Sequence, residues 1–263
     1  MIERTLTAVR YLQPFRQGGS VPALVEADDG ELYVVKFHGA AQGRRALVAE
    51  LLAGEIGCIL GLRVPELAFI WIEPNFGMGE AHQEIREMLN ASAGLNLGLR
   101  FLPDSLEYNP LLKPSPAPDE AAAIVWFDAL VTNVDRTARN VNILLHQRQL
   151  WLIDHGSSLY FHHTPAWYGE DAVLKRSRTP FPLVKDHALL GFAGPMQEAD
   201  AQLRPLLHPE LVAKIVGLLP DSWLLDAVDP AVLRDAYRFW LNERLAASHV
   251  FVDEAENARA RLL

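Results

Sequence analysis

The polar loop Asn133–Asn142 and the segment that follows it contain the side chains that phosphoryl transfer requires. Asp135 and Asn140 lie five residues apart, and Asp154 follows 19 residues after Asp135. In this chemistry one carboxylate accepts the proton of the attacking hydroxyl, while an amide and a second carboxylate hold Mg²⁺ against the phosphate oxygens. A hairpin over residues 141–153 can return the chain, so we expect the three side chains to converge.

The Asp-x4-Asn spacing alone is a weak signal, because it arises by chance about once in a chain of this length. The alternative interpretation is a capped, hydrogen-bonded turn. The surrounding pattern favours chemistry: a buried helical run precedes the loop, a hairpin follows it, and Asp154 stands in an Asp-His-Gly sequence where the second strand ends.

A lysine in the first part of the chain strengthens this hypothesis. Lys36 ends a β-rich run, where it is either a solvated lysine or a ligand of nucleotide α- and β-phosphates. Glu50 lies 14 residues later, beside the apolar stripe of a helical run, and a carboxylate there needs a partner because burying it alone is costly. We expect a Lys36–Glu50 ion pair, with Glu55 as the competing candidate.

A glycine turn precedes the strand of Lys36. Gly18, Gly19 and Ser20 can turn backbone amides toward an anion, which predicts a phosphate-binding nest. An ordinary turn between strands is the alternative.

The first hundred residues are typical of a small β-rich lobe with one main helix. Gly30 marks a hairpin turn, because glycine tolerates the positive φ that tight hairpins need. Gly61 ends the helix. The expected strands are Val21–Ala27, Glu31–Phe37, Glu66–Ile72 and Asn96–Leu102, and the expected helix is Gln42–Leu60.

A proline-rich connector, Tyr108–Pro118, separates this lobe from a mostly helical remainder. We place the lobe boundary here, with residues 1–104 as the N-lobe, which binds the nucleotide, and residues 105–263 as the C-lobe, which carries the polar loop, the metal-binding segment and a helical tail. Within the C-lobe we expect a helix over Asp119–Thr132, a hairpin of Val141–His146 and Gln149–Ile153, and a helix that starts at Asp229-Pro230.

The composition of the 263-residue chain excludes several classes of protein. Lys and Arg number 24 and Asp and Glu 33, which gives a formal net charge of −9 and argues against general nucleic-acid binding. Cys58 is the single cysteine, so no internal disulfide forms, as is typical of a reducing compartment. The apolar runs are too short to span a bilayer and the start does not resemble a signal peptide, so we expect a cytoplasmic protein.

The chain resembles the HipA-like kinase family, within the protein-kinase-like and phosphoinositide-kinase-like superfamily. The segment from Phe127 to Asn140 is similar to the family's helix and catalytic loop, and Leu152–Gly156 to its metal-binding segment. Tyr33–Phe37 is similar to its lysine strand, and the segment from Ala49 through Pro65 to its glutamate helix. The resemblance spans roughly residues 14–160.

This resemblance implies an α+β, two-lobed protein-kinase-like fold and an ATP- and Mg²⁺-dependent kinase that phosphorylates a hydroxyl. Asp135 would be the base, Asn140 and Asp154 the metal ligands, and Lys36 the phosphate clamp. Adenine would bind the backbone near Phe101 and Leu102. Arg136 and Arg139 are candidates to neutralise the transferred phosphate, and ion-paired or solvated arginines are the alternative.

Two segments depart from ordinary protein kinases. Asn133-Val134 replaces the His-Arg pair before the catalytic aspartate, which argues against regulation by a phosphorylated activation loop, and His155 replaces the phenylalanine after the metal-binding aspartate. We also expect the chain to lack the extra N-terminal segment of HipA toxins, so we transfer neither their antitoxin partner nor their substrate.

We therefore expect a phosphotransferase, most simply a serine/threonine protein kinase. The alternatives are a nucleotide-binding pseudokinase that acts as an interaction module, and a small-molecule or lipid kinase on the same fold. The phosphate acceptor is an unidentified protein or small molecule.

Overall fold

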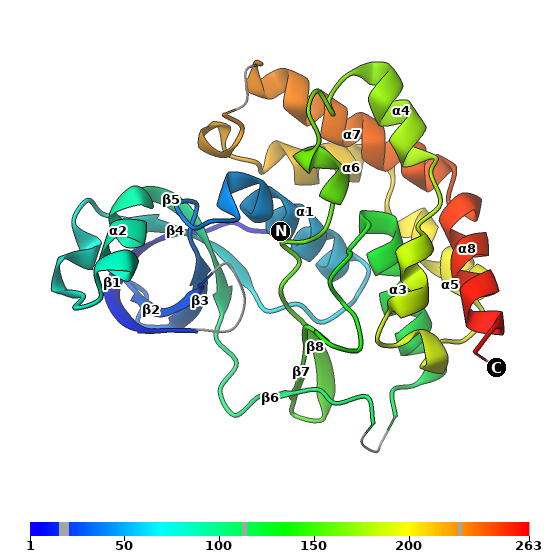
Figure 1. The fold of residues 1–263 in the computed structure, drawn as a ribbon, viewed down its shortest axis with the longest axis horizontal. Helices are drawn as coiled ribbons and strands as arrows, with labels where there is room; N and C mark the ends of the chain where they lie inside the picture. Colours follow the sequence, from blue (N-terminus) through cyan, green and yellow to red (C-terminus); the bar gives the residue numbers. More distant parts are fainter. Residues whose placement is uncertain (16–20, 112–114, 226–227, 263) are drawn as a thin grey trace.

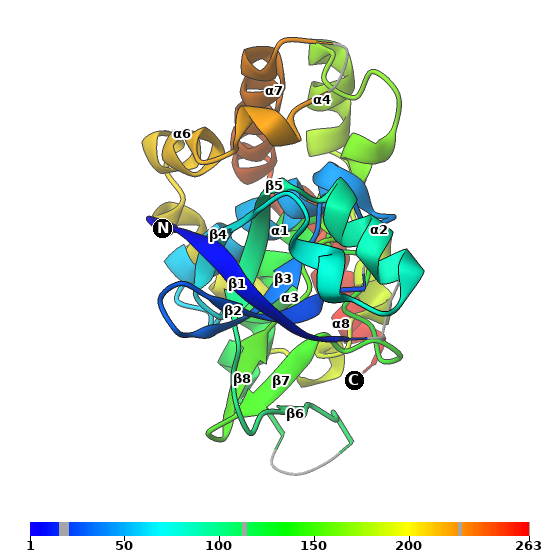
Figure 2. The same ribbon diagram turned by 90° about the vertical axis from the view of Figure 1, so that its left-hand side faces the viewer.

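The computed structural model describes residues 1–15, 21–111, 115–225 and 228–262, which form two lobes (Figure 1). The smaller lobe is a β-barrel and the larger one is mostly helical; Figure 2 looks onto the barrel, with the helical lobe behind it. None of the described helices is long and apolar enough to cross a membrane.

The barrel closes in the strand order β1-β2-β3-β5-β4. Its strands are β1 (Thr5–Pro14), β2 (Ala23–Ala27), β3 (Leu32–Lys36), β4 (Leu67–Ile72) and β5 (Gly94–Arg100). Successive side chains of a strand point to opposite faces, so Val25, Tyr33 and Val35 fill the barrel interior. Gly98 leaves room for this packing, because a Cβ at its position would lie 2.7 Å from Cγ1 of Ile70.

The hairpin between β2 and β3 turns at the predicted position. Gly30 has φ of +79°, and its N–H donates to the Ala27 carbonyl at 3.0 Å. The preceding Asp29 accepts hydrogen bonds from the Tyr33 hydroxyl and the Glu31 N–H, which fixes the turn. The hairpin sets the register that brings Lys36 to the end of β3.

Helix α1 (Gly43–Ile59) lies between the lobes and is buried along most of its length. Leu47 and Leu51 belong to the same hydrophobic core as Phe127 and Leu130 of the larger lobe. A shared core of this kind fixes the helix relative to both lobes, because close-packed side chains resist displacement.

The larger lobe begins with a small sheet in the order β6-β7-β8, formed by β6 (Leu106–Glu107), β7 (Ile143–His146) and β8 (Gln149–Leu152). Its central helix α3 (Pro118–Val131) is apolar on all sides and buried from Ile124 to Val131. A helix of this character belongs in the middle of a lobe.

The remaining helices are α2 (Gln83–Ala91) beside the barrel and, in the larger lobe, α4 (Glu170–Ser177), α5 (Met196–Leu203), α6 (Pro209–Gly217), α7 (Pro230–Ala246) and α8 (His249–Ala260). Of these, α5 and α8 pack against α3. Short 3₁₀ turns occupy Phe76–Gly79, Tyr160–His163, Pro182–Asp186, Leu190–Phe192, Arg204–Leu206 and Asp221–Trp223. The start of α7 confirms its predicted cap, because Asp229 Oδ1 accepts the Ala231 N–H at 2.7 Å.

Most of the expected elements are confirmed: the hairpin strands, the main helix, the two later barrel strands, the α3 helix and the β7–β8 hairpin. The sequence did not predict β1 or α2. The pairing of β6 with β7 joins residues 106 and 107 to the sheet of the larger lobe, and the lobe boundary at residues 104 and 105 stays a prediction.

Arg244 of α7 ties the ends of two other helices together. It is fully buried and donates to the carbonyls of Ala129 (2.7 Å) and Leu130 (2.8 Å) in the last turn of α3. It also donates, at 3.0 Å, to those of Ser177 and Thr179 at the end of α4. Terminal helix carbonyls lack intrahelical partners, so one guanidinium satisfies several of them at once.

Replacing Arg244 with methionine should therefore lower the free energy of unfolding by about 2–4 kcal/mol, because four carbonyl groups, three of them on buried residues, lose a charged donor. Urea denaturation measures this loss. Arg238→Met, which breaks an exposed ion pair with Asp235 on the same helix, is the matched control and should cost less than about 1 kcal/mol. Equal losses in the two variants would contradict the role of Arg244.

Candidate active site

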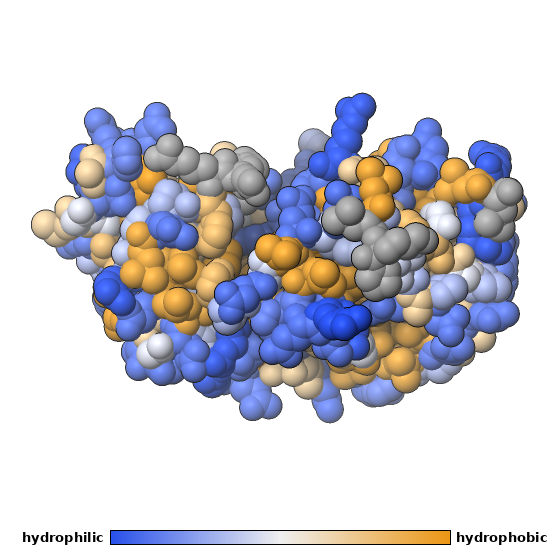
Figure 3. Space-filling view, turned by 90° about the horizontal axis from the view of Figure 1, so that it is seen from below, coloured by the Kyte–Doolittle hydropathy of each residue, from blue (hydrophilic) through white to orange (hydrophobic). Residues whose placement is uncertain are grey.

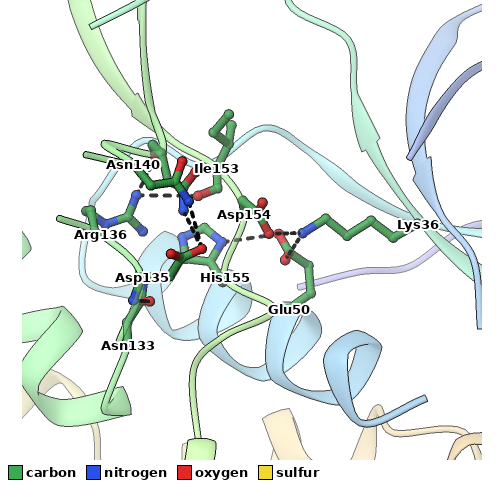
Figure 4. Close-up of polar contacts among 10 residues, drawn as sticks. Lys36, Glu50, Asn133, Asp135, Arg136, Asn140, Ile153, Asp154 and His155 are labelled. Carbon is green, nitrogen blue, oxygen red and sulfur yellow. Dashed lines mark hydrogen bonds and ion pairs between the residues drawn. The ribbon is translucent and has the colours of Figure 1, made fainter. Parts of the chain in front are cut away.

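Lys36 joins the two lobes through its ammonium group. Its Nζ lies 2.5 Å from Glu50 Oε2 of α1 and 2.5 Å from Asp154 Oδ1, which follows β8 (Figure 4). The Lys36 and Glu50 side chains are both buried, which confirms the predicted ion pair. Glu55, the competing candidate, instead accepts the Ile2 N–H at 2.5 Å.

The charges of this cluster stabilise one another. Burial alone would raise the pKa of Glu50, but Lys36 and a contact from His155 outweigh it and lower that pKa to about 2. Burial likewise opposes the charge of Lys36, while Glu50 and Asp154 raise its pKa overall. Glu50 is a carboxylate and Lys36 an ammonium at neutral pH.

His155 is a second partner of Glu50 that the sequence did not reveal. It is fully buried, its Nδ1 lies 3.3 Å from Glu50 Oε1, and its ring meets the edge of Phe127 at 5.7 Å between centroids. The residue that replaces phenylalanine here thus links the metal-binding segment to α1 through a polar contact.

Asp154 differs from the other acidic groups in its backbone and its exposure. Its φ is +55°, a left-handed conformation that non-glycine residues adopt at a cost and that is often found at functional sites. Its side chain is 39% exposed, whereas that of Glu50 is fully buried. One carboxylate oxygen contacts Lys36, so the exposed group can still bind a cation.

Asp135 is held by two amides of its own loop. Its Oδ2 accepts from Asn140 Nδ2 at 2.8 Å and from Asn142 Nδ2 at 3.3 Å. Each amide therefore directs its nitrogen to the carboxylate and keeps its carbonyl oxygen for another partner. Figure 4 shows Asp135 and Asn140 on one side of Asp154 and Lys36 on the other.

The loop departs from α3 through a left-handed cap. Thr132 has φ of +52°, and the Asn133 N–H donates back to the Asp128 carbonyl at 2.9 Å. Asn133 Oδ1 then accepts the Asp135 N–H at 3.0 Å, so the side chain closes the turn that presents the carboxylate. This is how Asn133 acts at the position where ordinary kinases carry histidine.

Arg136 is not a phosphate neutraliser, which corrects one of the roles considered for it. Its side chain is fully buried, and its Nε donates to Asp128 Oδ2 of α3 at 2.6 Å. The ion-paired alternative is therefore confirmed. Arg139 of the same loop is exposed.

Two predicted nucleotide contacts stay predictions. Gly18, Gly19 and Ser20 lie outside the described residues. At the other position, the Phe101 N–H donates to the Leu32 carbonyl at 2.8 Å and extends the sheet, so this N–H is already engaged.

An apolar wall beside Lys36 was missed from the sequence. Leu24 and Val34 are cross-strand neighbours, and alternation along β3 places Val34 on the face that carries Lys36. Leu24 is buried yet belongs to neither hydrophobic core of the described residues. The alternation of both strands, read together with the hairpin turn, was the signal for this wall. Seen from below, the surface is indented between the two lobes (Figure 3).

Comparison with protein families matches residues 8–167 to HipA-like kinases. The crystal structure of CtkA, a proinflammatory kinase of Helicobacter pylori, superimposes with a TM-score of 0.55 at 15% sequence identity, over 98% of this chain and 99% of that one. At this identity the likeness shows the fold, and it confirms the predicted two-lobed, kinase-like α+β architecture. The search of curated proteins gave no match.

The buried carboxylates predict a stability that falls in acid. Asp128 resembles Glu50 in this respect, because Arg136 and a hydrogen bond from His187 favour its charged form. The pKa values of both Glu50 and Asp128 are lowered to about 2, below the value of about 4 in an unfolded chain. Their contribution, on the order of 2 kcal/mol each, is thus complete above about pH 5 and is lost as the pH falls through 4 toward 2.

Urea denaturation between pH 7 and pH 3 measures this dependence. Asp128→Asn should make the decline below pH 4 shallower, because one of the two groups no longer binds a proton on unfolding. Asp253→Asn, at an exposed position of α8, is the control and should keep the wild-type slope. An unchanged slope in Asp128→Asn would exclude Asp128 as a source of the acid sensitivity.

Proposed function

The chain belongs to the HipA-like kinase family, and from that premise we propose that it transfers the γ-phosphate of ATP, with Mg²⁺, to the hydroxyl of a protein serine or threonine. The observation that carries this proposal is the ammonium group of Lys36, paired with carboxylates of both lobes. Such a pair aligns the phosphate-binding lysine with the metal-binding segment, as phosphoryl transfer requires.

The nucleotide fits the face of β2 and β3 that adjoins Lys36. Leu24 and Val34 offer apolar surface against which an adenine ring can pack, and the Leu102 backbone lies where β5 leaves the barrel. Lys36 lies beyond Val34 on the same face, at the position that suits the α- and β-phosphates. The proposed order along this face is therefore adenine, then phosphates, then Lys36.

Asn140 and Asp154 are the proposed ligands of Mg²⁺. Both present oxygen donors, which this cation prefers, and both are accessible: Asn140 is exposed and Asp154 is partly exposed. Because the Asn140 nitrogen is engaged by Asp135, the amide oxygen is oriented away from that carboxylate. When bound, Mg²⁺ supplies charge neutralisation to the phosphate oxygens.

Asp135 is the proposed base. Its carboxylate is held by Asn140 and Asn142 through one oxygen, Oδ2, which leaves Oδ1 to accept the proton of an incoming hydroxyl. The exposed Arg139 of the same loop is the remaining candidate to contact a phosphate. The hydroxyl of a small molecule would use the same groups.

The presence of every polar group of this site favours an active kinase over a pseudokinase. A nucleotide-binding module that does not catalyse transfer has no need for a carboxylate that two amides hold next to the candidate metal ligands. We therefore propose activity, and two substitutions separate binding from transfer.

Asp154→Ala should weaken Mg·ATP binding, because the cation loses its carboxylate ligand. Thermal melts measure this: ligand at about 100 times its dissociation constant should stabilise the wild-type protein by about 2.7 kcal/mol, or about 5–10 °C. The shift should require Mg²⁺ and be lost in Asp154→Ala, whereas the exposed Asp253→Ala should keep it. A Mg²⁺-independent shift that survives in Asp154→Ala would overturn the assignment.

Asp135→Ala should strongly slow phosphate transfer and keep the Mg·ATP melt shift, because this carboxylate acts on the acceptor hydroxyl. Transfer is measured with γ-labelled ATP and casein as a general protein acceptor, with glycerol and free serine as small-molecule acceptors. Removing the base should reduce the rate by about 10²- to 10⁴-fold. Loss of the melt shift in this variant, or unchanged transfer, would contradict the role of Asp135.

A further inference from the structure

A buried carboxylate outside the proposed nucleotide site gathers donors from two separate parts of the larger lobe. Asp128, in the last turn of α3, is fully buried. Its Oδ1 accepts from Asn133 Nδ2 at 2.9 Å, and its Oδ2 accepts from Arg136 Nε at 2.6 Å and His187 Nε2 at 2.8 Å. Two of these donors flank Asp135 in the loop, and the third comes from the segment after α4.

Arg136 also contacts backbone groups beyond Asp128. Arg136 Nη1 donates to the Asn142 carbonyl just before β7, and it lies 3.4 Å from the Ile153 carbonyl just before Asp154 (Figure 4). One guanidinium therefore holds the loop against both strands of the β7–β8 hairpin. The position of Arg136 thus bears on Asp135, which precedes it, and on Asp154.

The third donor has a defined tautomer. The Leu189 N–H donates to His187 Nδ1 at 3.0 Å, so Nδ1 carries no proton. The hydrogen of this ring is then on Nε2, which donates to Asp128. Both ring nitrogens are engaged, and the residue is 9% exposed.

The backbone around His187 runs along the loop. Thr137 and His187 form an antiparallel bridge, and the Ala188 N–H donates to the Arg136 carbonyl at 3.1 Å. Residues 187 and 188 therefore lie beside the part of the loop that directly follows Asp135. A side chain that fixes these residues to Asp128 restrains that part of the loop as well.

We propose that His187 is a positioning residue for phosphoryl transfer: through its hydrogen bond to Asp128 it holds Arg136 and the catalytic loop in the geometry in which Asp135 meets the acceptor hydroxyl. This inference rests on the proposed function, because it assigns a role within the same reaction. His187 acts through Asp128 and contacts neither nucleotide nor metal ligand, so it should affect the rate of transfer and leave nucleotide binding unchanged.

Two substitutions distinguish the roles of the two ring nitrogens of His187. In His187→Asn the amide oxygen takes the place of Nδ1 and can still accept the Leu189 N–H, but the donor to Asp128 is lost. In His187→Gln the amide nitrogen reaches the place of Nε2 and can still donate to Asp128, but the acceptor for Leu189 is lost. Gln is therefore the conservative variant for the proposed contact, and Asn is the disruptive one.

The experiment measures ADP formation from Mg·ATP with casein as acceptor, in wild type and both variants. His187→Asn should lower kcat by about 10- to 100-fold, the effect of a small misplacement of reacting groups, with KM for ATP within about twofold of wild type. His187→Gln should keep kcat within about threefold. His208→Asn, at an exposed histidine before α6, is the matched control.

Several outcomes overturn the inference. These are an unchanged kcat in His187→Asn, equal losses in the two variants, or a raised KM for ATP in place of a lowered kcat. If His187→Asn does not fold, His187→Gln decides by itself, because a Gln variant below about one-tenth of the wild-type kcat contradicts a role through Asp128.

Hydrogen exchange tests the position of the loop by a measurement that does not depend on turnover. Backbone amides of residues 133–142 should lose protection in His187→Asn and keep it in His187→Gln, and equal protection in both would overturn the inference. Wild-type protein that shows neither a Mg·ATP melt shift nor ADP formation would instead reject the proposed function, and the assigned role in transfer with it. The exchange result still tells whether His187 restrains the loop.

Discussion

The buried carboxylate of Glu50 is the group on which the meeting of the two lobes depends. Placing a charge inside a protein costs several kcal/mol unless it is paired and hydrogen-bonded. Glu50 meets this requirement with Lys36 from the barrel and His155 from the larger lobe, so neither lobe can shift without exposing or unpairing it. The same pairing sets the distance between the lysine and Asp154.

In the larger lobe, the buried carboxylate of Asp128 is likewise paired and hydrogen-bonded. Arg136 neutralises it and His187 donates a hydrogen bond to it, and together they order the loop of Asp135. The two networks meet at Phe127, the neighbour of Asp128 in α3, whose ring packs against His155. Glu50 of α1 and Asp128 of α3 are thus buried carboxylates that each organise one side of the candidate site.

The sequence predicted the parts of this protein that depend on local signals. Local signals act within a few residues and can be recognised in the sequence, as at Gly30, at Asp229 and in the spacing of Asp135 and Asn140. Strand β1 was missed because two register irregularities interrupt its alternation, and the nine-residue α2 because only Leu89 is buried in it. The burial of Arg136 was also hidden. It depends on Asp128, and one further partner of Asp128, His187, lies 59 residues away.

The charges at the cleft bear on how a nucleotide can enter. Lys36 supplies one positive charge to a group in which Glu50, Asp154 and Asp135 supply three negative ones. Glu50 is satisfied by its buried partners, whereas Asp154 and Asp135 are partly exposed. A bare triphosphate would meet like charges there, and a triphosphate that arrives with a divalent cation would meet ligands for that cation. The excess of carboxylates therefore supports the proposal that nucleotide and metal bind together, with Lys36 contacting the phosphates that the metal does not.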